Sequence, residues 1–323
     1  GETYVCTDAT TDANVWYNIG GGDGDVVPYS FQGSNYGYVY GGASNSGATE
    51  HVDVQKYSFT SDGAGTDVGS LNSARHAYTA ASSVTHGYCM GGWTGTQEDI
   101  DKFAFAVANG FTASLVGNLG VGRNYCSGFS TQSYGFAAGG NPGTTNRIDR
   151  FDFANEGQTT DWADLHTGTA SSSNGVSGAT HGYTASTTLI QKFQYASQVT
   201  GTVYGGSLTY ASISQSGATA STTHGYIIGG NQAPTSKTIQ KFSFATENSS
   251  TLVGDIFSDN NLGIFLPSSA SSTDYGYRAG GDDVSGGTEI NVIDKHSFSA
   301  DGNATDVGDL DHARNYLGQG SQY

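Results

Sequence analysis

A Gly-Tyr or Gly-Phe step, in most copies followed by a Gly-Gly pair, recurs along this chain at a nearly constant interval. The step occurs six times, at residues 37, 87, 135, 182, 225 and 276, so that successive copies are 43 to 51 residues apart. A period in that range indicates stacked supersecondary units, each of which buries its apolar surface against the next. The repeat therefore predicts the fold class, whereas it constrains the biochemical function much less.

Each unit contains four short pieces that are rich in aromatic and β-branched residues. In the second copy they span residues 78–83, 87–92, 100–105 and 115–119, separated by Gly, Ser, Asn and Asp. Such pieces predict short antiparallel strands joined by turns, and no window shows a helical period. The third piece carries apolar residues on both faces, as expected for a sheet buried between two neighbours. We therefore predict an all-β propeller with four-stranded blades.

The pattern resembles the kelch repeat family of β-propellers. In that family an Arg begins the inner strand, a Gly-Gly pair ends the second strand, the third strand carries an aromatic residue and the fourth often a Trp. The Arg and aromatic positions are filled here by Arg75, Arg123 and Arg314, and by Tyr57, Phe103, Phe151, Phe193 and Phe242. The Trp is present only as Trp162 and Trp16, and Val-Gly-x-Leu replaces it in other copies. The resemblance covers roughly residues 26–323, and the Gly/Ser/Tyr-rich style is similar to kelch-like segments of marine bacteriophage tail-fibre and virion proteins.

The number of blades depends on how the two ends of the chain are used. The first-strand piece occurs seven times and the other pieces six times, which leaves an inner strand at 313–322 whose edges need partners. The N-terminal pieces 3–8 and 14–19 form a predicted hairpin. We therefore predict a single domain, 1–323, with seven blades: the hairpin of residues 1–25 and the closing strand 313–323 complete a composite blade beside six repeats in 26–312. The alternative is six blades plus an N-terminal hairpin.

The charge balance restricts the partners. The chain has 29 Asp and Glu against 12 Lys and Arg, a formal charge of −17, which argues against nucleic acid and anionic membrane surfaces as partners. No apolar stretch approaches membrane-spanning length, so no membrane insertion is expected. Six basic residues share one position of the third strand: Lys56, Lys102, Arg150, Lys192, Lys241 and Lys295. We expect each to lay its stem between blades and pair with an acidic neighbour, the alternative being a functional basic ring.

Three cysteines, Cys6, Cys89 and Cys126, exclude a fully paired disulfide framework. A bridge between Cys89 and Cys126, on adjacent blades, is conceivable, but burial as small hydrophobic residues is expected. The chain begins with Gly1 and lacks an initiator Met and a leader, so we interpret it as a processed or truncated product.

No constellation of catalytic or cofactor-binding residues stands out. His86, His181 and His224 precede the Gly-Tyr step, but Tyr stands there in the other copies, so we expect repeat packing rather than a metal ring. The turns 62–67 and 301–306 lack the ligand count of an EF-hand calcium loop and predict ordinary Asp-Gly turns. Neither a nucleophile elbow nor a phosphate loop is present. We expect no enzymatic activity, no cofactor and no metal.

The repeats differ most in the segment between the second and third strands. Counted from the Gly of the Gly-Tyr step to the apolar residue that opens the third strand, the distance is 17, 13, 13, 8, 14 and 17 residues in successive copies, and the fourth copy has lost its Gly-Gly pair. Loops carry function on rigid scaffolds, so the long loops 41–53 and 280–292 form the candidate contact rim, with neutral drift in loop length as the alternative. The residues expected to bind a ligand are Asn45, Glu50, His51, Trp93, Asn141, Asn231, Gln232, Asp282, Asp283 and Glu289.

These observations predict a non-enzymatic recognition or adhesion module on a virion or extracellular surface, such as a phage tail fibre. Its partner would be a cell-surface glycan or protein, or another virion subunit, and a homo-oligomer is compatible with the sequence. The alternative is a purely structural decoration or spacer subunit, and a propeller enzyme is the least favoured reading.

Overall fold

The computed structural model describes residues 4–8, 15–18, 35–93, 98–106, 109–143, 145–169, 174–212, 215–230, 236–257, 263–284 and 287–318. These residues form strands and turns, and none of them belongs to a helix of the length and apolarity that crossing a membrane requires. The chain divides into two compact units, 1–31 and 32–323. In the first, β1 (Tyr4–Asp8) pairs antiparallel with β2 (Val15–Asn18).

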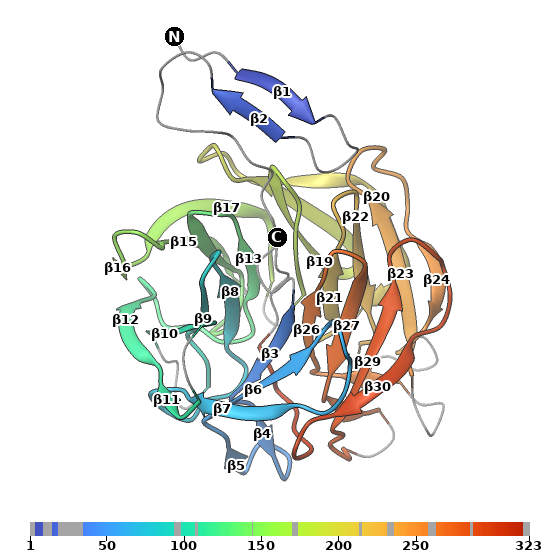
Figure 1. Cartoon of the computed structure of the whole chain (residues 1–323). Coiled ribbons are helices and arrows are strands. Elements are labelled where there is room, and N and C mark those ends of the chain that lie inside the picture. The colour runs from blue at the N-terminus through green and yellow to red at the C-terminus, as the bar shows by residue number, and fades with distance from the viewer. Residues whose placement is uncertain are drawn as a thin grey trace. The chain divides into compact units, whose positions relative to one another are not determined.

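The described residues of the second unit form a β-propeller of six blades (Figure 1). In the second blade the antiparallel order is β8 (Thr79–Ser82), β9 (His86–Met90), β10 (Asp99–Ala104) and β12 (Ser114–Asn118). The same order recurs in the third, fifth and sixth blades: β13 (Ser127–Ser130), β14 (Tyr134–Ala138), β15 (Thr145–Asp152) and β17 (Thr160–Thr169); β21 (Gly217–Ala220), β22 (His224–Ile228), β23 (Thr238–Ser243) and β24 (Thr251–Asp255); β26 (Ser268–Ser271), β27 (Tyr275–Ala279), β29 (Val292–Ser297) and β30 (Thr305–Asp309).

The fourth blade has three elements, β18 (Gly175–Ser177), β19 (His181–Gln194) and β20 (Thr202–Ser212). Where the other blades have a loop between second and third strands, β19 runs through Thr187, whose backbone is left-handed (φ 55°). A β-carbon on Gly182 would lie 2.4 Å from Cε1 of Phe193. The two halves of β19 therefore lie side by side, as second and third strands do elsewhere, and the loop is lost as its sequence indicates.

The first blade consists of β3 (Tyr36–Tyr40), β6 (Asp53–Ser58) and β7 (Thr66–Ser70), and its inner edge meets the C-terminal segment. Asn315 and Ala43 exchange both backbone hydrogen bonds, at 2.8 and 2.9 Å. Arg314 donates to the carbonyl of Gly41 at 3.0 Å, just as Arg75 donates to that of Gly91 in the second blade. The C-terminal segment therefore begins the inner strand of the first blade.

The predicted seventh blade is wrong. We had paired the leftover C-terminal strand with the N-terminal hairpin, whereas its described part, up to Gly318, completes the blade of β3, β6 and β7. The error arose because the piece near Tyr29 was counted as the inner strand of the first copy. That piece and residues 319–323 lie outside the described residues. The alternative, six blades with a separate hairpin, is the arrangement found.

Ion pairs join neighbouring blades at the repeated basic position. Across the closing seam, Lys295 Nζ lies 2.7 Å from Asp62 Oδ2. The same pairing occurs in Lys102–Glu156, Lys192–Glu247 and Lys241–Asp301. The expected inter-blade pairing is thus confirmed for four of the six residues, while Lys56 and Arg150 lie over aromatic rings. Because these pairs are partly exposed, each is worth about 0–1 kcal/mol. The Asp-Gly turns at Asp62 and Asp301 supply the carboxylates of two of these pairs.

The apolar core lies in layers between adjacent blades. Aromatic rings stack across the interfaces, for example Tyr277 on Phe59 with a centroid distance of 4.4 Å, and Tyr88 on Phe153 at 4.5 Å. Cys89 and Cys126 are free and buried, so their expected burial is confirmed and they form no bridge. Burial raises the pKa of both thiols, which keeps them protonated.

The Gly-Gly pairs connect each blade to itself and to the next. The first N–H bonds a carbonyl at the start of the third strand, and the second N–H bonds the following blade, as Gly91 does to Asp99 and Gly92 to Arg123. All ten glycines of these pairs in the described blades have positive φ. At Gly139 (φ +68°) a β-carbon would also lie 1.9 Å from Thr169 Oγ1. The predicted need for glycine at this position is confirmed.

Truncation tests which terminus closes the ring. A chain that begins at Gln32 should keep the melting temperature of the propeller, because the hairpin is a separate unit. A chain that ends at His312 lacks the buried Arg314 and Leu317 and should melt about 10 °C lower or fail to fold. Circular dichroism melts of both chains check this, and an unchanged melt of the C-terminal truncation would contradict six-blade closure.

Gly117 on β12 tests the close contact between blades. A β-carbon there would lie 1.9 Å from the carbonyl oxygen of Gly157 in the next blade, so Gly117→Ala should cost at least about 2 kcal/mol in urea unfolding. Gly302→Ala is the matched control, since no atom lies within 4 Å of its β-carbon, and we expect a change within about 0.5 kcal/mol. Equal costs would show that the blades relax at this contact.

His296 stands where four blades carry Phe and the first carries Tyr57, and its burial lowers its pKa from 6.5 to about 3. Between these pH values the unfolded chain binds a proton that the folded chain does not, so stability falls as pH drops through this window. At about pH 4.5 the loss is roughly 2.5 kcal/mol. His296→Phe should remove it, so wild type and variant, compared by urea unfolding at neutral and acidic pH, should diverge only on acidification. Parallel pH profiles would refute the assignment.

Candidate functional site

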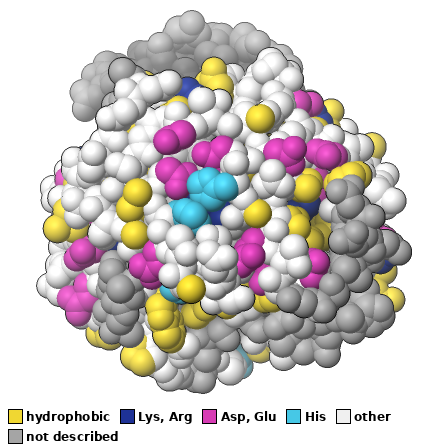
Figure 2. Space-filling view, turned by 90° about the horizontal axis from the view of Figure 1, so that it is seen from below, with side chains coloured by type: hydrophobic (Ala, Val, Ile, Leu, Met, Phe, Trp, Pro, Cys, Tyr) yellow, Lys and Arg dark blue, Asp and Glu magenta, His cyan; other side chains and the backbone are white. Residues whose placement is uncertain are grey.

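The loops between second and third strands gather at one end of the ring, which we name the loop face. It carries β4 (Ala43–Ser44) and β5 (Thr49–Glu50) of the first blade and β28 (Asp282–Asp283) of the sixth, which pairs with β25 (Ile264–Phe265). The N–H of Ser46 donates to Glu289 Oε1 at 2.8 Å and joins the two long loops. These loops were expected to flank a composite blade, but they are neighbours because the ring closes between their blades. Figure 2 looks onto this end and shows histidines with Asp and Glu side chains around them.

A belt of backbone hydrogen bonds underlies the loop face. Five residues that begin inner strands have left-handed backbone (φ 52–68°): Ala77, Tyr125, Gln215, Leu266 and Tyr316. Tyr125 N–H donates to the Ala77 carbonyl at 2.8 Å, and Ala77 N–H donates to that of Tyr316 at 2.7 Å. Leu266 N–H donates likewise to Gln215 at 2.7 Å. This conformation costs a non-glycine residue roughly 1 kcal/mol, so the hydrogen bonds between blades hold it in place.

Four aromatic side chains form a closed group, which we name the ring quartet: His76, Trp93, Tyr125 and Tyr316. His76 lies against Trp93 and Tyr316, and Tyr125 lies against the same two rings, with centroid distances of 5.2–6.4 Å. They come from three successive blades of the closed ring. Trp93 is 48% exposed, whereas His76 is buried, so the indole is the part of the quartet most available to a ligand.

Carboxylates surround the quartet. Glu50 Oε1 lies 2.9 Å from His76 Nδ1, and burial, partly opposed by Glu50, lowers the pKa of His76 so that it is neutral. Asp282 accepts a hydrogen bond from Asn315 Nδ2 at 3.0 Å, and burial raises its pKa. Burial, together with the charges of Asp282 and Glu289, raises the pKa of Tyr316. The loop face thus offers apolar rings beside hydrogen-bond acceptors.

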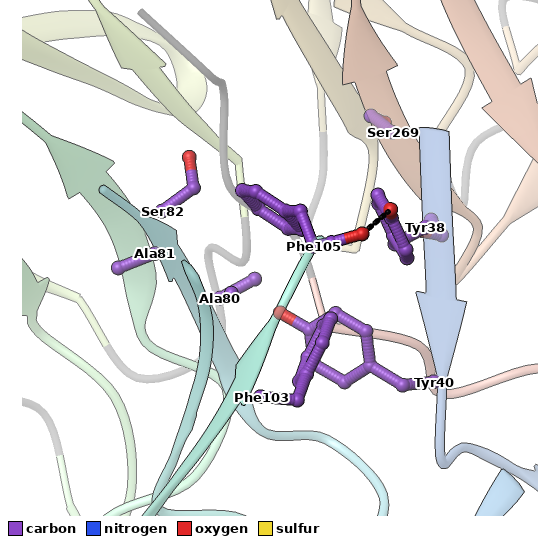
Figure 3. Close-up of a pocket in the computed structure, with 11 residues that line it drawn as sticks. Tyr38, Tyr40, Ala80, Ala81, Ser82, Phe103, Phe105 and Ser269 are labelled. Atoms are coloured by element: carbon purple, nitrogen blue, oxygen red, sulfur yellow. Dashed lines mark hydrogen bonds between the residues drawn. The ribbon is translucent and has the colours of Figure 1, made fainter. Parts of the chain in front are cut away.

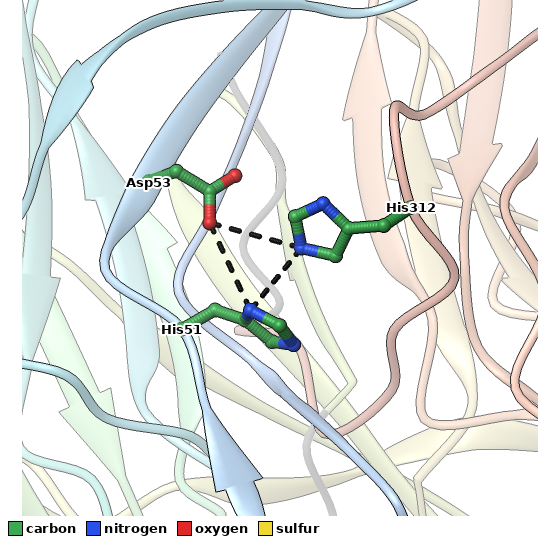
Figure 4. A group of neighbouring side chains, drawn as sticks. All are labelled: His51, Asp53 and His312. Carbon is green, nitrogen blue, oxygen red and sulfur yellow. Dashed lines mark hydrogen bonds and ion pairs between the residues drawn. The ribbon is translucent and has the colours of Figure 1, made fainter.

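A second group on the loop face, His51, Asp53 and His312, is the one among the described residues that could hold a metal ion (Figure 4). His312 Nε2 lies 3.2 Å from His51 Nδ1, and Asp53 Oδ1 lies 4.0 Å from His51 Nδ1 and 3.8 Å from His312 Nε2. Burial and the neighbouring Arg314 lower the pKa of His51. Burial would raise the pKa of Asp53, but the charge of Arg314 and hydrogen bonds from Arg314 and Gln55 lower it.

The residues predicted from the sequence fall into three groups. Glu50, Trp93, Asp282 and Glu289 surround or belong to the ring quartet, and His51 belongs to the histidine group. The others are more scattered: Asn45 is exposed in the β4–β5 turn, Asp283 is buried, and Asn141 pairs with Asn124 in the third blade. Asn231 and Gln232 lie outside the described residues.

Sequence reasoning missed His76, Tyr125, Tyr316, Asp53 and His312. A signal for the two tyrosines was available, because Arg-Asn-Tyr occurs twice, at 123–125 and 314–316, on the Arg of the inner strand. Their meeting with His76 and Trp93 requires the ring closure that the sequence did not reveal. His86, His181 and His224 are the first residues of β9, β19 and β22 in separate blades, each 2.7–2.8 Å from the hydroxyl of the preceding Thr.

A cavity of about 30 Å³ lies between β3, β8 and β26, lined by residues that include Tyr38, Phe105 and Gly318 (Figure 3). The Tyr38 hydroxyl donates to the Phe105 carbonyl at 3.2 Å. This volume suits one or two water molecules rather than a ligand. The cavity flanks the inner edge of β3, where other blades carry a first strand. We therefore assign it to the closing seam of the ring rather than to a binding site.

Comparison with protein-family models and with curated proteins found no match for this chain. The propeller and its six blades rest on the structure itself, and the kelch resemblance stays a prediction.

Proposed function

We propose that this chain is a non-enzymatic recognition module whose loop face binds a neutral glycan or a protein on a cell surface. In this proposal the module belongs to an extracellular or virion surface, as its kelch-like, Gly/Ser/Tyr-rich style led us to expect.

One observation carries the proposal: the exposed indole of Trp93 lies in a ring quartet beside carboxylates. Sugar rings present apolar C–H faces that pack on aromatic rings, and their hydroxyls donate hydrogen bonds to carboxylate oxygens. Apolar contact with a few placed polar groups is the usual composition of a small-molecule site. Glu50, Glu289 and the Asn45 amide are such groups on this face.

The charge of the chain limits the classes of ligand that could bind. A formal charge of −17 and carboxylates around the quartet repel polyanions, which disfavours sulfated or sialylated chains and nucleic acid. Neutral sugars, amino sugars and basic protein surfaces remain. Because the hydrogen-bonded belt fixes Tyr125 and Tyr316 before any ligand arrives, little ordering is needed on binding.

Replacing Trp93 tests the proposal. The fluorescently labelled chain is applied to an array of neutral, amino and acidic glycans, and we expect it to bind neutral or amino glycans. Trp93→Ala should weaken the affinity for the glycan that binds by at least about tenfold. Because the indole is half exposed, its loss should change the free energy of unfolding by about 1 kcal/mol or less.

Tyr210→Ala is the matched control, since Tyr210 is 40% exposed on β20 of the fourth blade, away from the quartet. It should leave binding unchanged. Binding that Tyr210→Ala abolishes and Trp93→Ala spares would place the site elsewhere. Failure to bind any glycan or cell-surface protein would favour the second function class, a structural decoration or spacer subunit.

A further inference from the structure

We propose that His51, Asp53 and His312 form a binding site for one divalent transition-metal ion of the zinc class on the loop face. This inference is independent of the ring quartet and of the glycan proposal.

The spacing of the three ligand atoms suits such an ion. Two ligands of a tetrahedral zinc ion, each at about 2.0–2.1 Å, lie about 3.3–3.4 Å apart. His51 Nδ1 and His312 Nε2 are 3.2 Å apart. Asp53 Oδ1 lies 3.8 and 4.0 Å from these nitrogens, so its carboxylate needs to approach by only about half an ångström. Imidazole nitrogens favour ions of the zinc class over hard cations such as Mg²⁺, and zinc also accepts a carboxylate ligand.

The far side of each imidazole is held by an oxygen. His312 Nδ1 lies 2.5 Å from Asp311 Oδ1, and His51 Nε2 lies 3.0 Å from Ser44 Oγ. When both far nitrogens donate to these oxygens, His51 Nδ1 and His312 Nε2, 3.2 Å apart, carry no proton and are available as ligand atoms. Metal-binding histidines are usually oriented by outer partners of this kind. The group is therefore supported from behind.

Asp53 is oriented in the same way. Both hydrogen bonds that it accepts from Gln55 and Arg314 go to Oδ2, which leaves Oδ1 facing the histidines. Arg314 is also the competing cation, since its Nη2 lies 2.6 Å from His312 Nε2. Metal binding exchanges that contact for a metal–nitrogen bond, while Arg314 keeps its bonds to Asp53 and to the Gly41 carbonyl. We expect weaker affinity than in closed four-ligand sites.

The position of the group gives the ion a defined effect. His51 and Asp53 come from the first blade's loop and strand, and His312 directly precedes the C-terminal inner strand, 261 positions later than His51. The side chains of His51, Asp53 and His312 are 17%, 18% and 36% exposed. Three protein ligands with solvent access leave the fourth position open. The ion would therefore fasten the two ends of the ring and present a coordination site on the loop face.

Calorimetric titration of the full chain, after treatment with EDTA, tests the site. Addition of ZnCl2 should show one bound ion per chain and raise the melting temperature, because the site exists only in the folded ring. His51→Gln and His312→Gln should each weaken zinc binding at least about tenfold. MgCl2 should not bind. CoCl2 should give the intense visible absorption of a tetrahedral site.

His224→Gln is the control, because His224 begins β22 of the fifth blade, next to Thr223, and its replacement should not affect zinc binding. The melting temperatures of the variants in EDTA show whether each remains folded. Absence of binding at millimolar zinc, or binding that both variants leave unchanged, would overturn the proposal. If a variant unfolds, the cobalt spectrum of the unaltered chain decides, and a weak octahedral spectrum would equally overturn it.

Discussion

The ring depends on buried arginines that clamp three segments at once. Arg75 reaches the carbonyls of Gly91 and Asp99 and the carboxylate of Asp101, and both charged side chains are fully buried. Such a pair is costly to break, at about 3–5 kcal/mol, because either partner alone would be a buried, uncompensated charge. The first blade obtains its arginine, Arg314, from the opposite end of the chain, and the sixth uses Arg278 of β27 against Asp294. The described parts of the fourth and fifth blades show no such arginine, and there the Asp position holds Gln191 and Gln240, which need no counter-ion.

The belt of backbone hydrogen bonds beneath the loop face separates the repeated blades from the loops, which vary from blade to blade. Its hydrogen bonds use backbone atoms, so the side chains there are free to differ, from Ala77 to Tyr125. The loops beyond it range from the missing loop of the fourth blade to the hairpin of β4 and β5 in the first. Both candidate sites lie where these loops meet the ring closure, and each combines residues from the first blade's loop with residues next to the C-terminal strand.

The sequence predicted what is local or repeated. The period predicted the propeller, the Gly-Gly pairs indicated positions of positive φ, and the shared basic position indicated ion pairs with the next blade. All three features depend only on one repeat and its neighbour. The prediction of the number of blades was wrong because that number depends on which of two distant strands Asn315 pairs with. Local sequence patterns do not determine such a pairing. The ring quartet and the His51–His312 contact could not be predicted for the same reason, because both require the pairing of distant segments. Trp93 was predicted from its residue type and loop position, but Tyr316 becomes its near neighbour only after closure.

The use of Arg314 and Asn315 by the first blade also sets an order of events during synthesis. The inner edge of β3 is made early, yet its described partner, Arg314 and Asn315, is made only after the strands of the other five blades. Until then the nascent chain carries five blades in sequence and an unpaired strand edge, the kind of surface that recruits other chains. Closure must wait until all six repeats have been made, so crowding of ribosomes on one message would favour pairing between chains over pairing within one. A chaperone at the ribosome exit would therefore influence the yield of folded propeller more than the stability of any single blade.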